Sequence, residues 1–244
     1  MFLKNIPNFI SLLNLLSGIL ACIFILQGDF TQGFFFVCLG IFFDFFDGLA
    51  ARLLKASSPL GIQLDSLADA TTSGLAPGLA MFQLLRSENG IDHSLPMIDA
   101  STPYIAYFGL VISLGAAYRL AKFNIDTRQT DSFIGLPTPA NAMLILSIPL
   151  ILLYQFDTWF AQIFNQDWVL IGICLISVYL MNAEIPLFSL KIKSFQLKEN
   201  KLSVSFLLAC IVLLIQLHFI GLFLIIPFYV LLSLIVNSRM KAST

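Results

Sequence analysis

Long apolar segments alternate with short polar ones along the whole chain. The near-continuous apolar ranges are 8–27, 33–54, 61–85, 103–123, 138–154, 168–182, 202–217 and 219–237. A helix needs about 20 apolar residues to cross a bilayer core about 30 Å thick. The pattern therefore predicts an all-α, polytopic transmembrane helix bundle with about eight spans. The fifth and sixth ranges are short, and only His218 and a turn at Gly221 would separate the last two, so six or seven spans are the alternatives.

The composition places the chain in a membrane independently of this pattern. Hydrophobic residues make up 58% of the chain and charged residues 11%, and the mean hydropathy is +0.90, which is typical of an integral membrane protein. The longest polar linkers, 86–101 and 183–201, are too short to fold alone. We therefore expect one integral-membrane domain over residues 1–244. The net charge of −1 gives no reason to expect a nucleic-acid partner.

The basic residues are distributed unevenly between the two sides of the predicted bundle. With eight spans and a cytoplasmic N-terminus, Arg86 alone of the 13 Lys and Arg residues falls outside, as the positive-inside rule favours. The others are Lys4, Arg52, Lys55, Arg119, Lys122, Arg128, Lys191, Lys193, Lys198, Lys201, Arg239 and Lys241. This predicts cytoplasmic termini, a basic cytoplasmic loop at 183–201 and a cytoplasmic turn between the second and third spans. Such a face suits anionic membrane lipids, and we expect a prokaryotic cytoplasmic membrane.

Four aspartates interrupt the second and third apolar ranges. Asp44 and Asp47 stand at i, i+3, and Asp65 and Asp69 stand at i, i+4, so each pair shares one face of its helix. A charged side chain at membrane depth costs about 2.5–3.5 kcal/mol even on a lenient scale. We therefore expect bound cations to offset these four carboxylates and an active site at 44–69.

The residue types around the aspartates indicate the chemistry of the ligand. Carboxylate oxygens without thiolates or imidazoles suit Mg²⁺, Mn²⁺ or Ca²⁺, and we favour Mg²⁺ or Mn²⁺. Gly48 and Ala51 keep the helix surface low, and the Arg52 guanidinium can bind phosphate oxygens in a forked geometry. These features predict a diphosphate site. A bundle core paired only with Arg52 and Arg119 is the structural alternative, but two cations cannot neutralise four carboxylates.

A glycine pair in the third span predicts close helix packing. Gly74 and Gly78 form a GxxxG pattern, and small residues at this spacing favour contact between helices over contact with a ligand.

The motif Asp44-x2-Asp47-Gly48-x2-Ala51-Arg52-x8-Gly61-x3-Asp65-x3-Asp69 resembles the signature of the CDP-alcohol phosphotransferase family at all eight fixed positions. Looser patterns resemble its CDP-diacylglycerol–serine O-phosphatidyltransferase branch, the phosphatidylserine synthases. They are Ile6-Pro7-Asn8, Leu13-Asn14-Leu15-Leu16-Ser17-Gly18, Leu64-Asp65-Ser66-Leu67-Ala68-Asp69, Arg119-Leu120-Ala121-Lys122-Phe123-Asn124 and Phe133-Ile134-Gly135-Leu136-Pro137. The last hundred residues resemble the branch mainly in hydropathy.

The resemblance implies an enzyme that transfers a phosphatidyl group from CDP-diacylglycerol to the hydroxyl of L-serine. The products would be phosphatidylserine and CMP. Two metal ions would be held by Asp44, Asp47, Asp65 and Asp69, and Asp69 would also act as the general base. The family further implies a homodimer.

The resemblance also implies which residues bind the substrates. Those expected to bind CDP-diacylglycerol are Pro7, Asn8, Phe9, Ile10, Gly48, Ala51, Arg52, Ser58 and Gly61. Ser58 could instead be only a turn residue and Asn8 only a helix cap. We place the serine carboxylate near Arg119 and Asn124, whose alternative role is to anchor a helix end at the membrane surface.

Two other functions compete with this interpretation. A sibling transferase would use another alcohol, such as glycerol 3-phosphate or inositol phosphate. A divalent-cation transporter would line a path through the bilayer with acidic residues. The transporter is the weaker alternative, because the four aspartates stand near one level and transport does not require the remaining residues of the motif.

Overall fold

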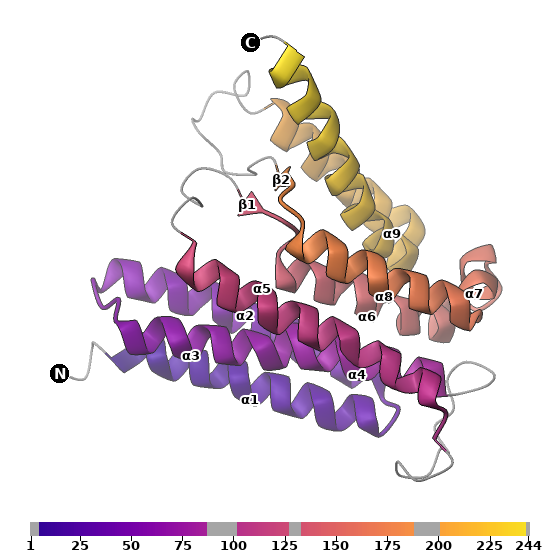
Figure 1. The fold of residues 1–244 in the computed structure, drawn as a ribbon, viewed down its shortest axis with the longest axis horizontal. Coiled ribbons are helices and arrows are strands. Elements are labelled where there is room, and N and C mark those ends of the chain that lie inside the picture. Colours follow the sequence, from indigo (N-terminus) through magenta and orange to yellow (C-terminus); the bar gives the residue numbers. More distant parts are fainter. Residues whose placement is uncertain (1–4, 87–101, 127–132, 188–200, 243–244) are drawn as a thin grey trace.

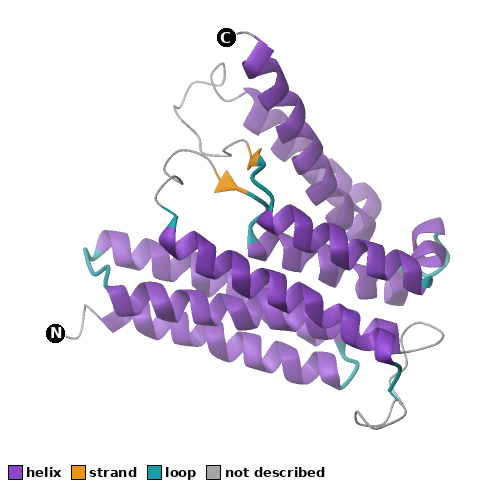
Figure 2. Cartoon of the chain, viewed as in Figure 1, coloured by secondary structure: helices purple, strands orange, loops and turns teal. Residues whose placement is uncertain are grey.

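The computed structural model describes residues 5–86, 102–126, 133–187 and 201–242, and these parts form a helix bundle (Figure 1). The longer helices are α1 (Ile6–Leu26), α2 (Phe30–Leu53), α3 (Pro59–Asp69), α4 (Ala76–Arg86), α5 (Val111–Ile125), α6 (Thr138–Tyr154), α8 (Asp167–Asn182) and α9 (Lys201–Ala242). A π-helical turn, η2 (Ala70–Leu75), joins α3 to α4, and a 3-10 segment, η3 (Tyr104–Leu110), precedes α5. The two-residue strands β1 (Phe133–Ile134) and β2 (Pro186–Leu187) pair antiparallel (Figure 2). The prediction of an all-α fold is confirmed.

Local sequence explains where the helices around the site begin. Pro7 lies in the first turn of α1, where its missing N–H costs no helical hydrogen bond. Asp29 caps α2 by accepting a hydrogen bond from the backbone N–H of Gln32 at 2.9 Å. Ser58 caps α3 in the same way, accepting from the Gly61 N–H at 3.0 Å.

Each of the eight predicted apolar ranges falls on a helical segment of the described chain. The third range runs through α3, η2 and α4, and the fourth runs through η3 and α5. By length and composition, four helical stretches suit a membrane span: Ile6–Leu26, Phe30–Leu53, Tyr104–Ile125 and Leu202–Ser238. α6 and α8 are shorter apolar helices. The short helix α7 (Trp159–Phe164) lies between them and was not predicted.

The last two predicted spans are the arms of a hairpin within α9. The 37 residues of Leu202–Ser238 would extend about 55 Å as one straight helix, well beyond a bilayer core. His218 breaks the helix with φ 50° and ψ −118°, and the Phe206 and Phe228 rings then stack across the arms at 5.6 Å. Gln155 holds the bend through hydrogen bonds to the Leu217 carbonyl and from the Ile220 N–H, each 3.1 Å.

Burial distinguishes the interior helix from the outer ones. Residues 144–151 of α6 are buried on every side. α2 fully buries only Phe30, Gly33, Val37, Gly40 and Asp47. Four of its phenylalanines are exposed: Phe35, Phe42, Phe45 and Phe46. Figure 1 shows α1, α2 and the α3–α4 rod together on one side of the bundle, with α9 on the other. The bundle is therefore an integral membrane protein with an apolar outer surface.

Small residues allow α4 and η2 to approach α5 closely, as the GxxxG pattern predicts. A Cβ added at Gly74 would lie 3.1 Å from the Ala116 Cβ, and one added at Gly78 would lie 2.1 Å from the Ser113 hydroxyl. The same hydroxyl donates a hydrogen bond to the Gly74 carbonyl at 3.1 Å. The prediction of helix packing at this pair is confirmed.

Candidate active site

The four aspartates of the motif come together where α2 and α3 pack beside α1. Oxygen atoms of Asp44, Asp47 and Asp65 all lie within 4.8 Å of one another. Asp69 stands one helical turn further along α3 than Asp65, and its Oδ1 accepts a hydrogen bond from the Asn14 Nδ2 at 3.1 Å. The two pairs therefore face each other, with three carboxylates in one cluster and the fourth held against α1.

α1 supplies a neutral hydrogen-bond donor to one aspartate of each pair. The Ser11 hydroxyl donates to Asp47 Oδ2 at 2.5 Å, and the Asn14 amide donates to Asp69. Ser11 and Asn14 are 3% and 0% exposed. Since neither carries a charge, these donors orient two carboxylates without neutralising them.

The charge of the cluster is not balanced by the described protein residues around it. Arg119 of α5 is a buried cation that attracts Asp69. Arg52 is exposed, and its Nε donates to the Gly48 carbonyl at 3.0 Å. Asp65 Oδ1 is buried and has no hydrogen-bond partner among the described residues.

These carboxylates fit a divalent metal ion. A buried, unpartnered carboxylate oxygen is costly, and a cation bound at the cluster would satisfy it with the oxygen ligands that Mg²⁺, Mn²⁺ and Ca²⁺ prefer.

A cavity of about 190 Å³ opens beside the aspartates, bounded by α1, α2 and the turn that leads into α3. Of the residues expected to bind CDP-diacylglycerol, those that line it are Pro7, Asn8, Gly48, Ala51, Arg52, Ser58 and Gly61. Asp47 and Asp65 also line it, and so does Ser11, for which the sequence indicated no role. The cavity thus connects the carboxylates to a surface with room for a ligand.

Two motif glycines at this cavity serve different purposes. A Cβ added at Gly48 would have no described atom within 4 Å, so the missing side chain leaves open space. At Gly61 an added Cβ would lie 2.9 Å from Asn8 Oδ1 and 3.2 Å from Ser58 Oγ. Gly61 therefore lets α3 approach α1, whereas Gly48 leaves room for a ligand.

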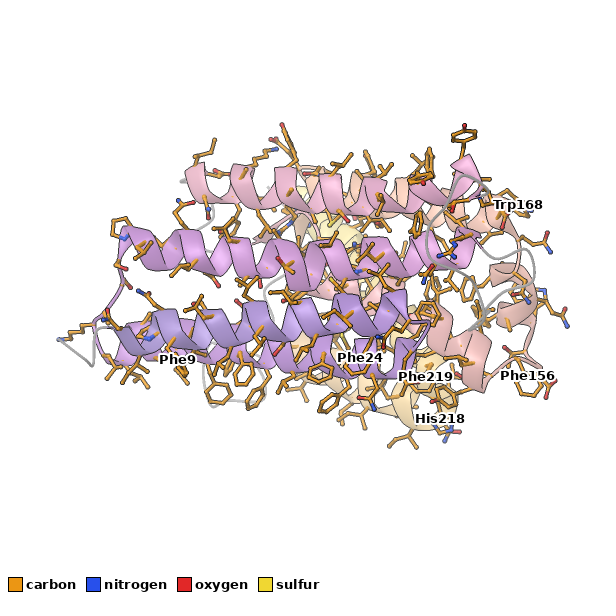
Figure 3. All side chains as sticks on the ribbon, turned by 90° about the horizontal axis from the view of Figure 1, so that it is seen from below. Phe9, Phe24, Phe156, Trp168, His218 and Phe219 are labelled. Atoms are coloured by element: carbon orange, nitrogen blue, oxygen red, sulfur yellow. The ribbon has the colours of Figure 1, made fainter. Side chains whose placement is uncertain are left out.

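Phe9 and Ile10 do not line the cavity. Phe9 is 62% exposed on the outer side of α1 (Figure 3), and Ile10 is half-buried. Neighbouring helix residues point about 100° apart, so one short segment of α1 cannot direct four consecutive side chains into one cavity.

The two predicted serine-binding residues, Arg119 and Asn124, have different surroundings in the structure. Arg119 is buried, its Nε has no hydrogen-bond partner among the described residues, and it lines a small cavity of about 20 Å³. Asn124 does not line this cavity and instead exchanges hydrogen bonds with Ser66 of α3, the shorter at 2.9 Å. Asn182 of α8 lines the cavity with Arg119, and its Oδ1 is also buried without a described partner.

A comparison with known protein families shows which family this chain belongs to. Residues 4–180 match the family model described as CDP-alcohol phosphatidyltransferase. The chain belongs to this family. Membership makes it a phosphotransferase and removes the basis for a transporter.

Several curated relatives carry the name CDP-diacylglycerol–serine O-phosphatidyltransferase. The one from Bacillus subtilis is 34% identical over 144 residues, which cover 59% of this chain and 75% of the relative. The one from Methanocaldococcus jannaschii is 31% identical and shares 58% of this chain and 59% of its own length. The one from Helicobacter pylori is 31% identical over 70% of this chain and 69% of its own length.

Proposed function

We propose that this protein transfers the phosphatidyl group of CDP-diacylglycerol to the hydroxyl of L-serine, giving phosphatidylserine and CMP. The observation that carries the proposal is the cluster of Asp44, Asp47 and Asp65, in which one buried oxygen has no hydrogen-bond partner among the described residues. Asp47 and Asp65 line the cavity together with Gly48. The names of the relatives supply the alcohol, which the cluster itself does not specify.

The residues around the cavity bind and orient the lipid nucleotide. The low surface at Gly48 and Ala51 admits the diphosphate close to α2. Because the Nε of Arg52 is engaged by the Gly48 carbonyl, its two terminal nitrogens remain for phosphate oxygens. Asp44, Asp47, Asp65 and Asp69 would hold two metal ions, Mg²⁺ or Mn²⁺. When bound, these ions supply positive charge that polarises the phosphate and stabilises the leaving group.

The transfer breaks one phosphoanhydride bond and forms one phosphodiester bond. The serine hydroxyl oxygen attacks the β-phosphorus, and the bond from this phosphorus to the bridging oxygen breaks. CMP leaves with that oxygen, and Asp69 takes the hydroxyl proton as general base. The hydrogen bond from Asn14 occupies one oxygen of Asp69. The other oxygen has two lone pairs, one for a metal ion and one for this proton.

The charges beside Arg119 favour a zwitterionic acceptor over a phosphorylated one. The small cavity is lined by two cations, Arg119 and Lys122, and by the acidic Asp126. Lys122 also lies 3.5 Å from Glu184. This mixed set matches the carboxylate and ammonium of serine better than the two negative charges of a phosphate monoester. We assign the serine carboxylate to Arg119. The Asn182 Nδ2 already donates to the Gly115 and Val178 carbonyls, and its Oδ1 has no hydrogen-bond partner among the described residues, so we assign this oxygen to the serine ammonium. Asn124 supports Arg119's helix through Ser66.

The wider organisation belongs to the proposal as well. The N-terminal end of α1, the α2–α3 turn and the C-terminal end of α5 meet at one end of the bundle (Figure 1), and the predicted charge distribution assigns this end to the cytoplasm. Lys191, Lys193 and Lys198 of the predicted basic loop lie outside the described residues. We further propose a single domain that forms a homodimer within a prokaryotic cytoplasmic membrane.

The test is CMP release by purified protein in detergent with CDP-diacylglycerol and Mn²⁺ or Mg²⁺. L-serine, glycerol 3-phosphate and inositol phosphate are offered in parallel, and the lipid product is identified by mass. We expect serine-dependent CMP and phosphatidylserine from the wild type, a loss of at least 100-fold in Asp69→Asn, and wild-type rates in Asp157→Asn, whose aspartate is exposed in the α6–α7 turn.

The outcomes separate the family from the substrate. CMP that appears only with another alcohol would replace serine while keeping the transferase. Serine-dependent CMP that survives Asp69→Asn would remove Asp69 from the chemistry.

A further inference from the structure

Asn14 of α1 hydrogen-bonds both Asp69, the last residue of α3, and Thr72, which lies in the turn that follows. Its Nδ2 donates to Asp69 Oδ1 at 3.1 Å, and its Oδ1 accepts from the Thr72 hydroxyl at 2.8 Å. The Thr72 hydroxyl also lies 3.1 Å from the backbone carbonyl of Asn14. Both Asn14 and Thr72 are 0% exposed, so these hydrogen bonds are shielded from water.

The contacts determine which way the Asn14 amide faces. A reversed amide would turn its oxygen toward the Asp69 carboxylate, and two acceptors would then repel each other. In the observed orientation the Thr72 hydroxyl gives its proton to an Asn14 oxygen and the amide gives its own to Asp69. Each of these buried groups thus gains a partner.

Two glycines on different helices make room for this pair. A Cβ at Gly18 of α1 would lie 2.3 Å from the Thr72 hydroxyl oxygen and 2.9 Å from its backbone nitrogen. A Cβ at Gly40 of α2 would lie 2.5 Å from the Thr72 methyl carbon and 2.8 Å from Asn14 Oδ1. α1, α2 and η2 therefore meet at Thr72 with no space for another side chain.

The helix changes its geometry at this point. Asp69 ends α3, and the π-helical turn η2 begins at the next residue and contains Thr72. Such turns often occur at functional sites. Here the turn places Thr72 three residues after Asp69. The side chains of Asp69 and Thr72 both hydrogen-bond Asn14.

We propose that Asn14, itself held by Thr72, is a positioning residue that fixes the Asp69 carboxylate in the orientation that the transfer reaction needs. The inference rests on the proposed function and adds to it a residue outside the eight-position motif. One carboxylate oxygen is held against α1, and the other is directed to the reactants. Asp69 thereby differs from Asp44, Asp47 and Asp65, which form the three-carboxylate cluster.

The experiment compares four variants of the full chain. Asn14→Ala removes the amide, and Thr72→Val removes the hydroxyl with little change of shape. Thr72→Ser keeps the hydroxyl. Ser17→Ala is the matched control, because Ser17 is buried on the same helix and its described hydrogen bond goes only to the Leu13 carbonyl at 2.8 Å. For each, kcat and KM for CDP-diacylglycerol are measured, and Mn²⁺ binding is followed by electron paramagnetic resonance.

A misplaced reacting group can cost about 100-fold in rate. We expect Asn14→Ala to lower kcat by about 10- to 100-fold while KM for CDP-diacylglycerol changes less than about threefold. Thr72→Val should lower kcat in the same sense, and Thr72→Ser should retain more activity than Thr72→Val. Bound Mn²⁺ should remain, and Ser17→Ala should keep its kcat.

Two results would overturn the inference. An Asn14→Ala protein within twofold of wild-type kcat would show that Asp69 needs no such support. Loss of Mn²⁺ binding in proportion to loss of activity would make Asn14 part of the metal site instead. If the wild-type protein releases no CMP with any alcohol, the proposed function fails, and the role of Asn14 fails with it. If the wild type and the Asn14→Ala variant are both fully active, only the role of Asn14 fails.

Discussion

Replacing Gly48 by alanine should make the protein more stable but a poorer enzyme. Gly48 lies within α2, where glycine costs about 0.5–1 kcal/mol relative to alanine. An added Cβ would meet no described atom within 4 Å, so no steric cost offsets this gain. We expect the free energy of unfolding to rise by up to about 1 kcal/mol.

The same methyl group should weaken substrate binding, because Gly48 lines the cavity proposed for CDP-diacylglycerol. Inserting a methyl group into a closely packed contact costs about 1–3 kcal/mol. At about 1.4 kcal/mol per tenfold, this corresponds to a roughly 5- to 150-fold lower kcat/KM. The effect should appear mainly in KM for the lipid nucleotide, because the carboxylates are unchanged.

Gly172 provides the matched control. It lies in α8, and a Cβ added there also meets no described atom within 4 Å, but it does not line the cavity. Gly172→Ala should therefore stabilise the protein to a similar extent and keep the wild-type KM. Reversible unfolding in detergent and initial rates at varied CDP-diacylglycerol would measure both effects. A Gly48→Ala enzyme with unchanged kcat/KM would refute the placement of the diphosphate at this surface.

Three other perturbations test separate parts of the structure. Arg119→Gln should raise KM for serine about tenfold or more, because a charged hydrogen bond contributes about 1.5–3 kcal/mol; a serine titration that matches wild type would place the carboxylate elsewhere. Mn²⁺ at about 100 times its Kd should stabilise the wild type by about 2.7 kcal/mol against thermal unfolding. Addition of a chelator, or the substitution Asp65→Asn, should remove this stabilisation. Equal stabilisation of the Asp65→Asn variant by Mn²⁺ would argue against the carboxylate cluster as the metal site. Gln155→Leu should lower the free energy of unfolding by about 1–3 kcal/mol, because it removes the hydrogen bonds to the Leu217 carbonyl and the Ile220 N–H at the α9 bend. Gln162→Leu is the control, since Gln162 of α7 is exposed. Equal unfolding curves for the two variants would contradict a role of Gln155 in holding the bend.

The membrane helices could be predicted because their determinant is local. A helix in a bilayer must be apolar over its whole length, so hydropathy alone located all eight ranges, including the break at His218. Hydropathy did not predict the short helix α7, because α7 lies between two apolar ranges. It did not predict the π-helical turn η2 either, because an α-helix and a π-helix of the same apolar residues have the same hydropathy.

Apart from what the family resemblance implies, the candidate site was predictable only as far as residues share one helix. Spacing placed Asp44 beside Asp47 and Asp65 beside Asp69, because helix geometry fixes such neighbours. Contacts between helices have no comparable signal, so the Thr72–Asn14 hydrogen bond, across 58 residues, was not foreseen. For the same reason nothing in the sequence indicates that Asn124 hydrogen-bonds Ser66 or that Asn182 lines the small cavity beside Arg119.

One face of α1 carries a sequence signal for the contacts between helices at the site. The buried residues of this apolar helix include Pro7, Ser11, Asn14 and Gly18, at spacings of four, three and four, which is one helical face. Polar side chains within a span face the bundle interior, so this stripe of residues marks the side that meets the site. Along it, Pro7 lines the cavity, Ser11 donates to Asp47, Asn14 donates to Asp69, and Gly18 makes room for Thr72. α1 thus acts as the common wall that orients carboxylates from two other helices, and a substitution on this stripe should impair the chemistry more than one on its lipid-facing side.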